Sequence, residues 1–64
     1  MIYDPGREHN VTVWGETFTV TVYQKSKSVW IAVGTYLGER IETKDASAGS
    51  ALKRWTEAAR YNGG

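Results

Sequence analysis

The chain has 64 residues, no cysteine, one histidine and a formal net charge of +1. This length supports one hydrophobic core, so residues 1–64 are expected to form a single domain. Such a core contributes roughly 3–5 kcal/mol; with no disulfide and too few ligands for a zinc site, association with another chain is the added stabilisation that the composition favours.

The first nine residues show no hydrophobic periodicity, and we expect residues 1–9 to be irregular. Asp4, Arg7 and Glu8 lie within them, and they contain no apolar stretch of the kind found in a signal peptide. We therefore expect no secretion, and the lack of cysteine agrees with a cytoplasmic location.

Apolar and polar residues alternate over residues 10–14 and again over residues 17–24, which predicts a β-hairpin. Gly15-Glu16 between these strands suits a two-residue turn of type II′, which begins with glycine. This turn sets Val13 opposite Phe18, so the apolar residues of both strands share one face of the sheet.

A third alternating segment, residues 29–36, follows the polar stretch 25–28. A four-residue loop places Tyr23 opposite Trp30; a tighter loop at Lys25-Ser26 shifts the pairs by two residues and keeps the same faces. We favour the longer loop, because lysine and serine rarely adopt the positive φ of a tight turn. In both versions the aliphatic residues of the third strand join those of the first hairpin on one face.

Leu37-Gly38-Glu39 is typical of a three-residue turn, with glycine supplying the unusual φ. Residues 40–44 can then return as a fourth strand, with Ile41 opposite Thr35. Because this segment also contains glutamate and lysine, which are weak strand formers, we expect a sheet of three or four strands.

Residues 46–61 have the periodicity of a helix, and Asp45 or Ser47 is its expected N-cap. The apolar stripe of this helix consists of Ala48, Ala51, Leu52, Trp55, Ala58 and Ala59. Residues 62–64 are typical of a helix end. Together with the Met1 start, they lead us to expect a whole small protein.

These elements predict an α+β fold. A three- to four-stranded antiparallel meander (about residues 10–14, 17–24, 29–36 and 40–44) carries one C-terminal helix (about residues 46–61) on its aliphatic face. Trp55 is expected at the centre of this contact. One helix covers about one face of such a sheet, so we expect the other face to be uncovered.

The uncovered face is expected to be a shallow trough with aromatic walls and a floor of small residues. Its predicted members are Trp14, Tyr23, Trp30, Tyr36, Thr19, Thr21, Ala32 and Gly34. Exposed apolar patches mark interaction sites, and Trp and Tyr commonly anchor them. We therefore expect a small non-enzymatic interaction module that forms a homodimer or binds another protein, most simply with sheet against sheet.

Other interpretations of the trough stay open. Bases of single-stranded nucleic acid could stack on its aromatic rings. The possible phosphate contacts are then Lys25, Lys27, Arg40 and Lys44. The near-neutral net charge and Glu42 on the same face argue against this interpretation. The aromatic residues could also serve only as good strand formers, or Ile2 and Tyr3 could fold back over the face.

No pattern indicates catalysis, and we expect no enzyme, no cofactor and no metal site. His9 has no second base or nucleophile at a catalytic spacing, and no glycine-rich phosphate loop opens the helix. The longest apolar run, residues 29–33, is far shorter than the ~20 residues that span a bilayer. We therefore expect no membrane segment.

Two nucleic-acid modules share strands followed by a helix with this sequence, but not their binding residues. The final helix of the double-stranded RNA-binding domain opens with lysines, whereas residues 45–50 contain no basic residue. The plant AP2-type DNA-binding domain is similar at residues 29–30 and 34–36, with a different spacing and without the arginines of its reading strands. Residues 38–42 (GERIE) and 52–61 (LKRWTEAARY) resemble a group of short, uncharacterised bacterial proteins. That resemblance implies this fold, a bacterial cytoplasm and no known activity.

Overall fold

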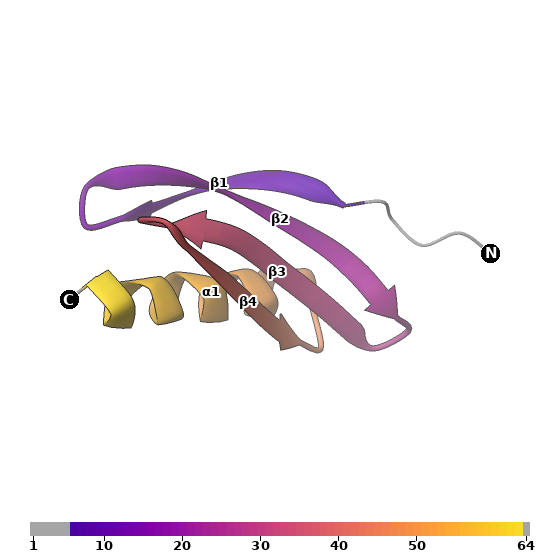
Figure 1. The fold of residues 1–64 in the computed structure, drawn as a ribbon. Helices are drawn as coiled ribbons and strands as arrows, with labels where there is room; N and C mark the ends of the chain where they lie inside the picture. Colours follow the sequence, from indigo (N-terminus) through magenta and orange to yellow (C-terminus); the bar gives the residue numbers. More distant parts are fainter. Residues whose placement is uncertain (1–5, 64) are drawn as a thin grey trace.

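The structure is a computed structural model that describes residues 6–63. One antiparallel sheet, with strand order β1-β2-β3-β4, carries one helix, α1, across one of its faces (Figure 1). The elements are β1 Arg7–Val13, β2 Glu16–Ser26, β3 Val29–Tyr36, β4 Glu39–Asp45 and α1 Ala48–Gly63. The predicted α+β fold is confirmed. We name the side of the sheet toward α1 the helix face and the other side the open face.

β1 begins earlier than predicted. Arg7 pairs with Val22 and His9 pairs with Val20. β2 has 11 residues and is therefore long enough to pair with β1 residues that precede the predicted start of β1 at residue 10. The prediction that residues 1–9 are irregular is therefore wrong for residues 7–9. Its remaining part at residues 1–5, including the suggested fold-back of the N-terminus, lies outside the described residues.

The first hairpin turns one residue earlier than predicted. Its loop is Trp14-Gly15, with φ of 51° and 80°, which makes it a type I′ turn. Val13 therefore lies opposite Glu16, and the register differs by two residues from the predicted one. A two-residue shift keeps every side chain of β1 on its predicted face.

The second hairpin contains a β-bulge at Lys25, where the register shifts before a short turn. Tyr23 consequently lies opposite Ile31 and not opposite Trp30 as predicted. The register thus differs by one residue. Such a shift reverses the face of the whole partner strand.

The third hairpin also differs by one residue. Its loop is Leu37-Gly38, with φ of 50° and 86°, in place of the predicted three-residue turn, and Gly34 lies opposite Ile41. The two one-residue shifts cancel for β4, which keeps its predicted orientation. They leave β3 alone inverted relative to the prediction.

The inversion of β3 decides which of its residues meet α1. The helix face of β3 carries Trp30, Ala32, Gly34 and Tyr36. Ala32 and Tyr36 belong to the buried core, and Trp30 packs against it. Ile31 and Val33 lie on the open face, so their predicted place under the helix is wrong. Ile31 is nevertheless buried there, outside the core cluster.

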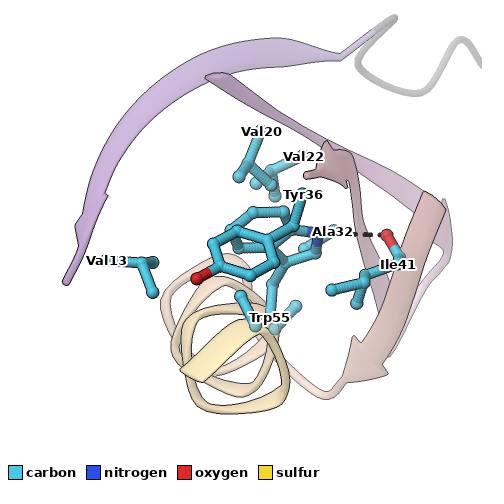
Figure 2. Packing of buried hydrophobic residues seen from close by; sticks show 9 residues of the cluster. Val13, Val20, Val22, Ala32, Tyr36, Ile41 and Trp55 are labelled. Carbon is cyan, nitrogen blue, oxygen red and sulfur yellow. Dashed lines mark hydrogen bonds between the residues drawn. The ribbon is translucent and has the colours of Figure 1, made fainter. Parts of the chain in front are cut away.

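Trp55 fills the centre of the layer between α1 and the sheet (Figure 2), which confirms its predicted place. Its Nε1–H donates a hydrogen bond of 3.0 Å to the carbonyl oxygen of Ile41. The ring of Tyr36 meets the indole edge-on, with centroids 6.5 Å apart. Gly34 leaves room for the indole, because a Cβ at this position would lie 3.1 Å from Trp55 Cζ2.

The start of α1 is held by two polar groups. Ser47 is the N-cap: its Oγ accepts the N–H of Ser50 at 3.3 Å. Asp45 instead accepts a 2.7 Å hydrogen bond from Arg54 Nε, and this bond lowers the pKa of the Asp45 carboxyl. The ion pair connects the end of β4 to the second turn of α1. The helix itself begins at Ala48, two residues later than predicted.

Candidate interaction surface

The eight residues predicted to form one aromatic trough lie in three places. Trp30, Ala32, Gly34 and Tyr36 face α1; Thr19, Thr21 and Tyr23 lie on the open face; Trp14 lies in the β1–β2 turn. The predicted trough on the open face is therefore wrong, because β3 is inverted. A hollow of small residues does exist on the helix face, and Trp55 of the same chain fills it.

The predicted phosphate contacts are only partly brought together. Lys25 and Lys44 line one shallow hollow of about 290 Å³, together with Ile31 and Glu42. Arg40 donates from Nη1 to Glu42 Oε1 at 3.2 Å, so its charge is partly neutralised. Lys27 lies in the β2–β3 turn. Tyr23 is the aromatic member of the predicted trough that shares the open face with these lysines.

Large exposed apolar side chains gather at one end of the molecule. Trp14, Leu37 and Tyr61 are 60%, 65% and 89% exposed. They belong to the β1–β2 turn, the β3–β4 turn and the C-terminal part of α1, which lie at the same end in Figure 1. We name the group formed by Trp14, Leu37, Glu57, Arg60 and Tyr61 the end surface. Large exposed apolar side chains gathered at one end of a small chain are typical of an interaction site.

Two members of the end surface occupy backbone positions that suit other residues better. Trp14 and Leu37 each hold the first position of a type I′ turn, with φ of 51° and 50°. Left-handed backbone costs a bulky L-residue about 1–2 kcal/mol, and asparagine or glycine is the usual choice there. The same combination of apolar side chain, exposure and strain thus occurs in both turns.

Trp14 is attached to the end of α1. Its Nε1–H points to the carbonyl oxygen of Arg60 at 3.4 Å, and the Arg60 guanidinium lies 5.4 Å from the indole centre. Such a cation–π contact contributes about 0.5–1 kcal/mol at an exposed site. Trp14, Glu57, Arg60 and Tyr61 together line a cleft of about 470 Å³ between the turn and the helix.

Sequence reasoning missed four of the five residues of the end surface. Leu37 was expected in an ordinary turn, and Glu57, Arg60 and Tyr61 belong to the predicted helix but not to its apolar stripe. The available signal was the pair of dipeptides Trp14-Gly15 and Leu37-Gly38, each at the tip of a hairpin. A large apolar residue before the glycine of a two-residue turn is unusual, and its occurrence in two turns is informative.

Comparison with known proteins adds no assignment: no protein family, no curated protein and no solved structure matches the chain. Within residues 6–63, no group of three or more His, Cys, Asp or Glu side chains is placed to hold a metal ion. The helix described here is too short and too polar to cross a membrane.

Proposed function

We propose that the chain is a small non-enzymatic interaction module that self-associates through the end surface. The observation that carries this proposal is that three large exposed apolar side chains lie at one end of the molecule (Figure 1), two of them on strained turn residues. Turns that serve folding alone favour asparagine or glycine at these positions, so Trp14 and Leu37 point to a role beyond folding. We assign this role to the cytoplasm, the compartment that a cysteine-free sequence favours.

A second copy of the same chain is the partner that we infer. A 64-residue chain without cysteine has a small core and gains from association. The exposed parts of Trp14, Leu37 and Tyr61 amount to roughly 400 Å². This is about half of the ~800 Å² that each partner buries in a standard interface. The area supports a weak dimer with a micromolar dissociation constant, and not a permanent assembly.

Leu37→Asn is expected to stabilise the monomer and weaken the dimer. Asparagine tolerates the left-handed backbone of the turn, so the free energy of unfolding should rise by about 0.5–1 kcal/mol. Loss of the leucine side chain from both copies should raise the dissociation constant at least about tenfold. Sedimentation equilibrium from about 1 to 500 µM measures the second effect, and thermal melts of the dilute monomer measure the first.

Leu37→Ala is the matched control for this experiment. It removes the same apolar side chain but keeps a residue for which positive φ is strained, so it should weaken the dimer without raising monomer stability. Wild-type protein that stays monomeric at the highest concentration contradicts the proposed function. So does a Leu37→Asn variant that associates as tightly as the wild type.

Binding of single-stranded nucleic acid is a second candidate, on a different surface. The supporting observation is the hollow on the open face that Lys25, Ile31 and Lys44 line. Tyr23 pairs with Ile31, and Ile31 pairs with Lys44, so the tyrosine lies in the same row of the sheet as this hollow. Phosphates could contact the two lysines while a base stacks on the tyrosine ring. The structure leaves Trp30 and Tyr36 out of this proposal, since both face α1.

The double variant Lys25→Ala, Lys44→Ala is expected to lower affinity for a labelled oligothymidine by about tenfold at low salt, because two phosphate contacts are lost. Fluorescence anisotropy measures this affinity. Lys53→Ala removes an exposed lysine from α1 and should change it little. Absence of oligonucleotide binding by the wild type at low salt, or equal loss in Lys53→Ala, would remove this candidate.

A further inference from the structure

The cleft of the end surface holds one acidic and one basic side chain. Glu57 and Arg60 both line it, beside the exposed rings of Trp14 and Tyr61. Among residues 6–63, neither side chain forms an ion pair; Glu57 attracts Arg54 only at longer range, and Arg60 lies over Trp14. Both charges are therefore available to a group that enters the cleft.

We propose that the second copy docks by two-fold symmetry, so that Glu57 of each copy faces Arg60 of the other. This inference rests on the proposed self-association through the end surface. A two-fold axis brings a surface onto itself in the reverse direction, so each contact occurs twice. Glu57 and Arg60, which carry opposite charges on the same helix, each then face the residue of opposite charge on the second copy. A patch of a single sign would repel its own copy.

The surrounding apolar side chains make this pairing effective. Contact between two end surfaces removes water from around Trp14 and Tyr61, and removal of water strengthens a charge pair at the edge of those rings. The Arg60 guanidinium can keep its place over Trp14 while its N–H groups point to the incoming carboxylate, because a planar guanidinium stacks and donates at once. The charges thus select the orientation of the dimer, and the apolar side chains contribute area.

Other arrangements of the same surface make different contacts. A head-to-tail arrangement would place the end surface of one copy on another part of its neighbour and would leave both pairs unformed. It would also continue into longer assemblies, because a heterologous contact does not close unless its rotation does. A two-fold contact stops at two copies. The mass of the assembly in solution and the effect of charge reversal at Glu57 and Arg60 therefore distinguish the two arrangements.

Mixing two charge-reversal variants tests the reciprocal pairs. In Glu57→Arg alone, arginine faces Arg60 of the second copy; in Arg60→Glu alone, glutamate faces Glu57. Each variant should dissociate at least about tenfold more readily than the wild type. In an equimolar mixture the mixed dimer has two pairs of opposite charge, one native and one with reversed sign, so it should form at least about tenfold more tightly than either variant alone. Sedimentation equilibrium of the two variants and their mixture measures this.

The matched controls are Glu8→Arg and Lys27→Glu, which make the same charge changes on β1 and in the β2–β3 turn. They should leave the dissociation constant unchanged, alone and mixed. Suppose that Leu37→Asn disrupts the wild-type dimer but the mixture of Glu57→Arg and Arg60→Glu shows no rescue. This result overturns the reciprocal pairs and leaves the proposed self-association intact. A wild type that is monomeric throughout overturns both proposals.

Circular dichroism shows whether the charge-reversal variants fold. If either does not, Glu57→Gln and Arg60→Gln replace them in a double-mutant cycle. Coupled effects, in which the double variant loses no more affinity than either single one, support the pairs. Additive effects overturn them.

Discussion

Replacement of Trp55 by alanine is expected to leave the chain largely unfolded at 25 °C. The indole is fully buried between α1 and the sheet, and truncation of such a side chain costs about 3–5 kcal/mol. A domain of 64 residues without a disulfide has about that much stability in total. Far-UV circular dichroism should show loss of the helix and sheet signals, and a thermal scan should show no cooperative transition.

Trp55→Phe separates the two contributions of this side chain. It keeps an aromatic ring in the core but removes the N–H that donates to the Ile41 carbonyl, so it should cost about 1–2 kcal/mol. That corresponds to a fall in the melting midpoint of roughly 4–8 °C per kcal/mol.

Trp14→Phe is the matched control, because it removes an indole N–H from a side chain that is 60% exposed. It should change stability by no more than about 0.5 kcal/mol. Both variants are compared with the wild type at a concentration low enough to keep the chains monomeric. A Trp55→Ala chain that melts cooperatively near the wild-type midpoint would contradict the packing described here.

The order of the elements could be predicted because it depends on residues close together in the sequence. Alternation indicates a strand and helical spacing indicates a helix, and neither requires knowledge of the partner strand. The helix stripe illustrates this: Ala51, Trp55 and Ala59 are fully buried, as their spacing indicates. The same local signals found all four strands, although they placed the start of β1 three residues too late.

The face of β3 could not be predicted from alternation, because it depends on the length of two connections. One residue in a connection decides which of two alternating sets points to the helix. The bulge at Lys25 takes up a residue without a glycine or proline to mark it. The turn after β3 consists of Leu37-Gly38, one residue fewer than the three-residue turn that the position of the glycine suggested. The two differences cancel at β4, so the orientation of Ile41 did not expose the error.

The shape of the predicted trough was meaningful, although its place and occupant were wrong. Ala32 and Gly34 between Trp30 and Tyr36 do form a hollow with aromatic sides, which suits an indole. We expected this hollow to lie on the open face, where a second copy or another protein would meet it. In the structure Trp55 of the same chain fills it, and the surface left for a second copy is the end surface.

Gly34→Ala tests the orientation of β3 by the sign of its effect. A Cβ at this position would lie 3.0 Å from the carbonyl oxygen of Thr19 and 3.1 Å from Trp55 Cζ2. The Thr19 carbonyl is fixed in the hydrogen-bonded sheet and the indole is packed on both sides, so neither can move away easily. The free energy of unfolding of the variant should therefore fall by about 1–3 kcal/mol. If Gly34 lay on the open face, alanine would stabilise the strand by about 0.5–1 kcal/mol, because glycine has more freedom to lose on folding.

Val33→Thr completes this test, since the two orientations of β3 make opposite predictions for it. The structure places Val33 on the open face, half-buried and opposite Glu42, so a hydroxyl there reaches water and should cost less than about 1 kcal/mol. Under α1 the same hydroxyl would lack a partner and cost about 1–3 kcal/mol. Urea unfolding of both variants therefore decides the matter. A destabilised Gly34→Ala with a tolerated Val33→Thr supports the observed register, and the reverse pattern would show that β3 faces the other way.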